Sequence, residues 1–337
     1  MEKQPTIIDV ARECGFSKST VSLVLQGSSE IPPETATAVH KAIKKIGYRR
    51  NRFARGLRTR RSKMVGMLIQ DHLNPFYGEL VHHVEQRMRE KGFDLVVISS
   101  NTDLKLEKLA LERLVDQQVD GLIVSAMDYR KIARLLQSYE ETGIHCVVAG
   151  PPARTIPFDC ATVDMSDATC VAMEHLFGLG HRKIAFLWGA PAFQAIGARF
   201  DTFREMMSGR GFSVPEKWIA HCGFRMRDGY EAAHSLLCGK NRPTAIFALN
   251  DLLAVGTVAA AIDLGLRVPR DLSVMGVDNV EIASYTRPAL TTISQPIEEY
   301  AHALSKLVLD GIEKKSAPCR VSLKAEFLVR GSTGPAA

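Results

Sequence analysis

The chain has 337 residues, of which 46% are hydrophobic and 24% charged, a composition that excludes a disordered or fibrous protein. Its length exceeds that of one typical core and indicates two or three folded units. The net charge of +6 is unevenly distributed: residues 1–63 hold 14 Lys or Arg against 5 Asp or Glu, and the remainder holds 29 against 32. This basic N-terminal part favours a polyanionic partner, with nucleic acid ahead of a membrane surface.

The chain has no uncharged apolar run of about 18 residues and opens with charged residues, so we expect a cytoplasmic protein without a membrane partner. Its seven cysteines are scattered, never in C-x-x-C pairs, and mostly lie inside apolar runs. We interpret them as small buried hydrophobic residues, and we expect neither a metal site nor a cofactor.

The segment "TIIDVARECG" predicts a first helix. Thr6 is a good N-cap, Asp9 lies three residues later, and Gly15 can end the helix with a positive φ. The apolar residues fall on one stripe, which consists of Ile7, Val10, Ala11 and Cys14.

Two further helices are predicted before residue 50. In "FSKSTVSLVLQG", Ser17 can cap a short helix that turns Val21, Val24 and Leu25 inward and Lys18, Ser19, Ser22 and Leu23 outward. A third helix is expected from about 34 to 46, with Gly47 as its end. Two short helices joined by a glycine-containing turn are typical of a helix-turn-helix, whose second helix enters the major groove.

The outer face of the second helix suits DNA. Lys18 can reach guanine acceptors, and the nearby hydroxyl groups can meet bases or phosphates. A plain three-helix bundle is the alternative, but it has no need for the basic excess or for the basic tail that follows.

The segments "TIIDVARECGFSKSTVSLVLQG" and "IGYRRNRFARGLRTRRS" resemble the N-terminal module of the lactose-repressor and purine-repressor family of bacterial transcription factors. The resemblance implies a helix-turn-helix domain over 1–49 and a hinge over 50–63 that becomes helical on DNA and wedges a leucine into the minor groove. The DNA-binding residues that we expect on this basis are Thr6, Ser17, Lys18, Ser19, Thr20, Ser22, Leu23, Gln26, Asn51, Ala54, Arg55, Leu57 and Arg58.

Three positions depart from the family pattern. Arg50 stands where a proline usually precedes the hinge asparagine, which makes the entry to the hinge less rigid and adds a phosphate-seeking charge. Where a serine commonly caps the third helix, this chain has Pro32 followed by Pro33, so the sequence leaves open which group caps this helix. Leu23 occupies an outward position that carries arginine in some relatives, so any base preference there comes from apolar contact.

From Met64 onward, apolar runs alternate with helical stretches. The predicted strands are "MVGMLI", "DLVVISS", "GLIVSA", "HCVVAG", "CATVDM", "KIAFLWG", "WIAHCGF", "AIFALN" and "LSVMGVD", and the predicted helices include 76–91, 105–117, 166–179, 197–210 and 252–264. This alternation predicts an α/β body of parallel sheets covered on both faces.

The body also resembles the family, as "NPFYGELVHHVE", "NDLLAVG" and "VMGVDNVEIASYTRPALTTISQP" illustrate. The resemblance implies a periplasmic-binding-protein-like fold over 64–337, with doubly wound subdomains of about 64–163 plus 293–322 and about 164–290 plus 323–333. It also implies a homodimer. The chain stops at "GSTGPAA" without apolar heptads, so we expect a dimer rather than a tetramer.

Polar residues cluster where the predicted strands end, which is where open α/β sheets bind ligands. Carrying the family's ligand positions over gives Asp71, Phe76, Ser125, Asp164, Arg199, Phe224 and Asp278 as effector-binding residues. Carboxylates, a guanidinium and aromatic rings suit a carbohydrate, although the family also binds nucleobases and sugar phosphates.

Several of these polar residues also have structural interpretations. Asp251 is expected to cap its helix, Asp278 can form a turn, and Phe224 can belong to the core. In "GLGHRK" we expect a helix end, with Gly180 as the cap and with His181, Arg182 and Lys183 favourable near the negative end of the helix dipole, rather than a ligand-binding or catalytic role for His181.

The sequence therefore predicts a transcriptional regulator, a repressor, that binds a near-palindromic double-stranded operator as a dimer, beside the nucleoid, under control of a small ligand. Whether the ligand releases or promotes DNA binding stays open. An enzyme is disfavoured because G-x-G-x-x-G, G-x-x-x-x-G-K-[ST], G-x-S-x-G and H-E-x-x-H are absent in the required contexts. A carbohydrate-binding transport protein is disfavoured by the basic module.

Overall fold

The computed structural model describes residues 5–26, 28, 30–48, 61–150, 157–189, 197–239, 241–313 and 317–337. The chain divides into two compact units, Met1–Ser62 and Lys63–Ala337. The expected hinge contacts lie outside the described residues; they are Asn51, Ala54, Arg55, Leu57 and Arg58.

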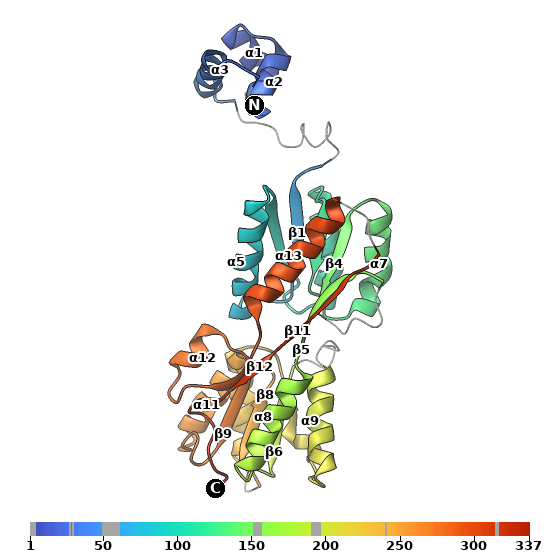
Figure 1. The fold of residues 1–337 in the computed structure, drawn as a ribbon. Helices are drawn as coiled ribbons and strands as arrows, with labels where there is room; N and C mark the ends of the chain where they lie inside the picture. Colours follow the sequence, from blue (N-terminus) through green and yellow to red (C-terminus); the bar gives the residue numbers. More distant parts are fainter. Residues whose placement is uncertain are drawn as a thin grey trace. The chain divides into compact units, whose positions relative to one another are not determined.

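The first unit consists of α1 (Ile7–Cys14), α2 (Lys18–Gln26) and α3 (Pro33–Ile46) (Figure 1). Their apolar faces meet in a buried cluster of Val10, Val21, Val24, Val39 and Ala42. Val10 of α1 and Val21 and Val24 of α2 belong to the predicted apolar faces, so the helical periodicity of these two helices is confirmed, and Val39 and Ala42 of α3 complete the cluster.

The helix ends follow the local sequence. The Thr6 side chain and the Asp9 carboxylate form a capping box at the start of α1, and Gly15 ends the helix with φ 75°. At α3 no side chain caps the helix. Instead Pro33 occupies its first position, where the missing N–H would have had no helical partner.

The second unit contains two six-stranded sheets, in the orders β11-β5-β4-β3-β1-β2 and β12-β10-β9-β8-β6-β7. The first sheet comprises β1 (Met64–Ile69), β2 (Asp94–Ser99), β3 (Gly121–Val124), β4 (His145–Ala149), β5 (Asp159–Asp164) and β11 (Arg320–Lys324). The second comprises β6 (Ile184–Trp188), β7 (Ile219–His221), β8 (Ala245–Ala248), β9 (Ser273–Asp278), β10 (Thr291–Ser294) and β12 (Glu326–Leu328). Neighbouring strands run parallel, except that β10 and β12 are antiparallel.

Helices cover both sheets. Those of the first sheet are α5 (Pro75–Glu90), α6 (Leu104–Asp116), α7 (Tyr129–Glu141) and α13 (Ile297–Glu313). Those of the second are α8 (Ser166–Gly178), α9 (Gly197–Gly209), α10 (Met226–Leu237), α11 (Asp251–Asp263) and α12 (Glu281–Tyr285), with a short 3-10 turn, η2 (Glu216–Trp218). We call the first sheet with its helices the N-subdomain and the second the C-subdomain. In the N-subdomain, α5 and α13 pack together (Figure 1). These two helices share one apolar cluster, whereas α6 and α7 contribute to another.

The chain passes between the subdomains after β5, after β10 and after β11. The first nine strands coincide with the predicted apolar runs, but β10, β11 and β12 were not predicted. β11 and β12 are short edge strands, and β11 alternates exposed with half-buried residues, so neither has an apolar run to mark it. Within the described ranges, no helix has both the length and the apolar character needed to cross a bilayer.

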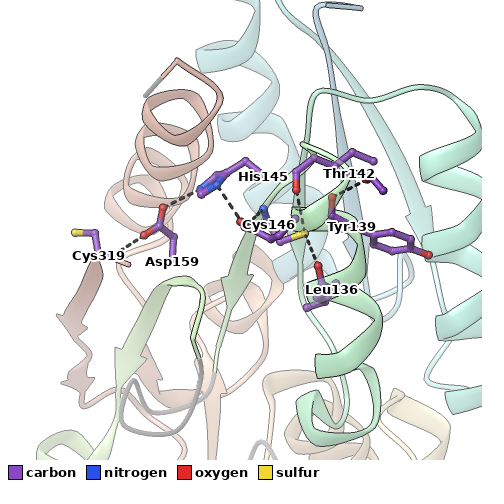
Figure 2. A network of polar contacts seen from close by, with 9 residues as sticks. Leu136, Tyr139, Thr142, His145, Cys146, Asp159 and Cys319 are labelled. Carbon is purple, nitrogen blue, oxygen red and sulfur yellow. Dashed lines mark hydrogen bonds and ion pairs between the residues drawn. The ribbon is translucent and has the colours of Figure 1, made fainter. Parts of the chain in front are cut away.

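A network of polar contacts connects α7 to the strands at one side of the N-subdomain sheet (Figure 2). His145 Nε2 lies 2.8 Å from Asp159 Oδ2, and His145 Nδ1 lies 3.4 Å from Glu140 Oε1. The backbone N–H of Cys146 donates to Glu140, and that of Cys319 donates to Asp159. The network therefore ties α7, β4, β5 and the start of β11 to one imidazole.

This imidazole occupies space that Gly311 leaves in α13. A Cβ added at Gly311 would lie 2.1 Å from ring atoms Cδ2 and Nε2 of His145. Alanine is the better helix former by about 1 kcal/mol, but the overlap forces the ring or the helix to move.

We predict that Gly311→Ala lowers the free energy of unfolding by about 1–3 kcal/mol because the repacking cost exceeds the gain in helix propensity. Gly178→Ala, at the open end of α8 with nothing within 4 Å of an added Cβ, is the matched control and should be neutral or slightly stabilising. Urea denaturation of both variants measures this, and equal effects would contradict the steric account.

Candidate functional site

The outer face of α2 carries the side chains expected to meet DNA. Lys18, Ser19 and Leu23 are exposed, and Thr20 and Ser22 are half-buried. The Ser17 hydroxyl accepts from the Thr20 N–H at 3.0 Å and lies 2.7 Å from the Ser19 hydroxyl. A cation and a group of ordered hydroxyls therefore stand at the first turn of this helix, where the helix dipole also favours phosphate.

Two of the expected DNA contacts differ from this group. Thr6 is exposed, but its hydroxyl donates to the Asp9 carboxylate within the capping box. The side chain of Gln26 lies outside the described residues. Leu23 has 36% of its surface exposed, so an apolar side chain interrupts the polar face as the sequence predicted.

In the body, Tyr77 links the residues expected to bind the effector. Its hydroxyl lies 3.5 Å from the Ser125 hydroxyl, and it interacts electrostatically with Asp71, Arg199 and Asp278. Burial raises the pKa of Tyr77 well above its ordinary value, so the phenol stays protonated. Phe76 was predicted as an effector residue and its neighbour Tyr77 was not, although "NPFYGEL" places both rings at the start of α5.

Asp278 and Arg199 form the charged centre of the site. Asp278 is 6% exposed, accepts from Gln295 Nε2 at 2.7 Å and is also hydrogen-bonded by Asn74. Arg199 donates from Nη1 to the carbonyl of Leu249 at 3.0 Å and attracts the Asp278 carboxylate. Burial raises the pKa of Asp278 to about 6, although Arg199, Gln295 and Asn74 all favour the ionised form.

The backbone at Asp278 is strained. Asp278 has φ 107° and the next residue, Asn279, has φ 58°, both in the region that favours glycine. Arg330 donates to Asn279 Oδ1 at 2.6 Å, and Asn279 donates to the Ser294 hydroxyl at 3.1 Å. Asp278 therefore lies in a sharp turn, as its structural interpretation predicted, and its contact with an effector stays a prediction.

An ion pair spans the two subdomains. Asp71, which follows β1 in the N-subdomain, is 5% exposed and has its Oδ2 at 3.5 Å from Arg225 Nε, just before α10. The other oxygen of Asp71 accepts from the Leu73 N–H. Arg225 was missed by the sequence analysis, since nothing in the local sequence indicates that the residue after Phe224 faces the other sheet.

The two predicted aromatic rings have different surroundings. Phe76 is buried and packs edge-on against Tyr77 at 5.2 Å between ring centroids. Phe224 is half-buried and packs against the C-subdomain core, where Gly189 leaves room for its ring. Its core contact agrees with the structural interpretation, and its exposed part leaves ligand contact as a prediction.

Asp164 has contacts of another kind. It is exposed at the end of β5, and its Oδ1 accepts from the Ser166 N–H at 2.9 Å at the start of α8. Its role toward an effector therefore stays a prediction.

The expectation that Asp251 caps its helix is wrong. Asn250 is the N-cap and accepts from the Leu253 N–H at 2.8 Å, while its amide donates to the Phe224 carbonyl. Asp251 is fully buried and accepts from the Thr292 hydroxyl at 2.6 Å and from the Val280 N–H at 2.9 Å. Its side chain turns toward the next strands because the preceding asparagine already fills the cap.

The helix end expected in "GLGHRK" is confirmed, but the favourable charge expected of His181 at that end is wrong. Gly180 does follow α8 with φ 88°, but His181 is 1% exposed and hydrogen-bonds Thr244, Ser273 and the carbonyl of Gly334. Burial lowers the pKa of His181, which favours the neutral ring. Across the described ranges, no group of three His, Cys, Asp or Glu side chains is arranged to hold a metal ion.

Comparisons with known proteins agree with this architecture. A model of "bacterial regulatory proteins, lacI family" matches residues 6–51, and one of a "periplasmic binding protein-like domain" matches residues 173–333. The transcriptional repressors PurR of Yersinia pestis (strain Pestoides F) and Yersinia pseudotuberculosis (serotype O:1b) are each 34% identical over 330 residues, covering 97% of this chain and 96% of theirs.

Solved structures are also similar over nearly the whole chain. A lac repressor dimer bound to operator and the anti-inducer ONPF has a TM-score of 0.86 at 25% identity, covering 98% of this chain and all of that one. The regulator CelR in complex with cellobiose has a TM-score of 0.71 at 28% identity with the same coverage.

The helix-turn-helix unit, the two-sheet body and these relatives define the class: the chain is a DNA-binding transcriptional repressor with a ligand-binding body, and not an enzyme. Within that class, it belongs to the lacI family of bacterial regulatory proteins.

The raised pKa of Asp278 predicts a pH dependence of stability. Because the folded chain retains this proton up to about pH 6 and the unfolded chain releases it near its ordinary value of 3.8, stability falls as the pH rises through this window. The difference corresponds to at most about 3 kcal/mol.

We expect Asp278→Asn to remove this fall, since the amide does not ionise. Urea unfolding of both proteins between pH 4 and 7 measures it, with Asp164→Asn, at an exposed carboxylate, as control. Parallel curves for wild type and Asp278→Asn would show that the carboxylate is not desolvated.

Proposed function

We propose that the chain represses transcription as a homodimer on a near-palindromic operator, and that a neutral carbohydrate bound around Tyr77 controls its affinity for DNA. The observation that carries the effector class is the balance of charge at the site. Asp278 faces Arg199 and Asp71 pairs with Arg225, so a ligand with hydroxyl groups and no net charge meets donors and acceptors without leaving a buried ion unpaired.

The shape of the same residues supports a sugar. The guanidinium of Arg199 can bind vicinal hydroxyls, the Asp278 carboxylate can accept from them, and Phe76 and Phe224 supply apolar ring faces. The similar regulator CelR is solved with cellobiose, which favours the same class of ligand.

The DNA interface follows from α2 and the basic segment after α3. Lys18 and the hydroxyls of the first turn would enter the major groove, while Asn51, Ala54 and Leu57 of the hinge would contact the minor groove. In a twofold dimer, two such units read half-sites about one helical turn apart, which requires a near-palindromic operator. Such a repressor works beside the nucleoid in the cytoplasm.

Control by the effector requires two states of the body with different ligand affinities. The ion pair between Asp71 and Arg225 joins the subdomains at the site, so a ligand that orders this pair favours one relative position of the subdomains. That position would set the spacing of the two hinges in the dimer and therefore the affinity for the operator.

A ligand screen tests the effector class. We expect neutral mono- or disaccharides to raise the melting temperature of the full chain, whereas sugar phosphates, sugar acids and nucleobases do not. Arg199→Ala should abolish the shift, and Arg182→Ala, whose guanidinium lies over the Phe212 ring, serves as the control in the same subdomain. A shift with the anionic ligands or nucleobases alone would reject a neutral sugar.

Gel shifts at several salt concentrations test whether Leu57 inserts into the minor groove of the operator. Leu57→Ala should weaken specific operator binding by a few kcal/mol while leaving salt-sensitive, non-specific binding nearly unchanged, because the leucine acts only at the unstacked base step. Leu106→Ala, at an exposed leucine of α6, is the control. Equal weakening of both binding modes would exclude the wedge.

A further inference from the structure

Two loops at the subdomain junction have the same construction. After β3 the chain runs Ser125, Ala126, Met127, and at the end of β9 it runs Asp278, Asn279, Val280. The first residue of each triplet, Ser125 or Asp278, interacts with Tyr77. The third residue, Met127 or Val280, has an apolar side chain that is 1% exposed. The two triplets come from different subdomains.

Each apolar side chain is buried in the core of the opposite subdomain. Met127 belongs to a cluster whose other buried members all come from the C-subdomain, between Ala168 and Ile293. Val280 belongs to a cluster whose other buried members come from the N-subdomain, including Tyr77 and Tyr300. The subdomains therefore exchange one apolar side chain each.

A buried carboxylate from a helix holds the backbone of each exchanged residue. Glu107 of α6 accepts from the Met127 N–H at 3.0 Å, and Asp251 of α11 accepts from the Val280 N–H at 2.9 Å. These carboxylates are 1% and 0% exposed, respectively. Neither helix otherwise requires a carboxylate there, since Asp103 caps α6 and Asn250 caps α11.

The surroundings of Asp251 are fitted to this contact. The second oxygen of Asp251 accepts from the Thr292 hydroxyl, and the backbone N–H of Asn279 also donates to the Asp251 carboxylate. At Gly276 an added Cβ would lie 2.2 Å from Asp251 Oδ1, so glycine leaves the room that the carboxylate occupies. Asp251 therefore adds bonds to the backbone of this strained turn, beside the bonds that the Asn279 side chain makes with Arg330 and Ser294.

Glu107 is less fully satisfied. Its Oε2 takes the Met127 N–H, while Oε1 has no hydrogen-bond partner among the residues that the structure describes. Burial raises the pKa of both Glu107 and Asp251. Burying a carboxylate with one oxygen unsatisfied lowers the stability of the fold. The bond to the Met127 N–H is therefore the contact that explains why a glutamate stands at this position.

We propose that Glu107 and Asp251 are matched positioning residues, which fix the two triplets so that Ser125 and Asp278 face the effector while Met127 and Val280 lock the opposite subdomain. Because each triplet is only three residues long and its third residue is bonded to a buried carboxylate, the position of its first residue is coupled to that of its third. The effector-facing role rests on the proposed function, whereas the exchange between subdomains does not.

Amide hydrogen exchange, measured on the full chain without any effector, tests whether Met127 and Val280 stabilise the opposite subdomain. Because no ligand is present, a negative result here is distinguishable from a negative result in the ligand screen. Asp251→Ala should speed exchange at least about tenfold at Val280 and also in the α5 and α13 peptides of the N-subdomain. Glu107→Ala should do the same at Met127 and in C-subdomain peptides of the cluster that Met127 enters.

Conservative variants separate positioning from charge. In Asp251→Asn the amide oxygen can accept from Val280 while its NH₂ donates to Thr292, and in Glu107→Gln the amide oxygen can accept from Met127. Both should keep the wild-type exchange pattern. The controls are Thr257→Val, which breaks a bond within α11 to Leu253, and Asp103→Ala at the α6 cap. Neither should act across the junction.

A second measurement is needed if Asp251→Ala or Glu107→Ala does not fold. It uses variants in which the exchanged side chains themselves are shortened. Val280→Ala and Met127→Ala leave the carboxylates intact and should speed exchange in the opposite subdomain by a similar factor. Acceleration confined to the subdomain that carries the substitution, or Asn and Gln variants that behave as the alanine variants do, would overturn the proposal.

Discussion

The buried negative charge of Asp278 is the constraint on which the body is organised. A carboxylate at this depth is stable only with polar neighbours, and those neighbours come from separate parts of the chain: Asn74 from the N-subdomain, Arg199 from the C-subdomain and Gln295 from the crossing after β10. Because none of these segments is adjacent in sequence, the site exists only when both sheets are formed and brought together. The same requirement makes the site sensitive to the relative position of the subdomains.

The rest of the junction is consistent with this constraint. The Asp71–Arg225 pair adds a second charge contact between the subdomains, and the exchanged side chains of Met127 and Val280 add apolar contacts beside it. Charged and apolar contacts therefore both depend on the relative position of the subdomains. Because an effector acts only through its different affinity for two states of a protein, these junction contacts are the ones on which the proposed control would act.

The DNA-binding unit was largely predictable because its information is local. Caps, glycine ends and the 3.6-residue stripe determine α1, α2 and α3, and each of these signals lies within a few residues of the element it controls. The sequence left the cap of the third helix open, and the structure shows that α3 begins at Pro33 without a side-chain cap. The central strands were equally visible as continuous apolar runs.

The misses have physical reasons as well. Edge strands β11 and β12 bury little, so they carry no apolar signal. Tyr77, Arg225 and Gln295 contact the predicted effector residues across the sheets, and no local sequence pattern marks these contacts. Asp251 and His181 were assigned to helix ends because carboxylates and basic residues usually act there, whereas burial turned both side chains toward partners far away in sequence.

The sequence by itself determined the class of protein: the charge excess of residues 1–63, the helix-turn-helix signals and the alternation of apolar strands with helices are all readable along the chain. Only the tertiary structure decided which polar residues share the site, how Asp278 is buried and which side chains the subdomains exchange. Local patterns depend on the next few residues, but burial and the field of distant charges depend on how the two sheets are brought together.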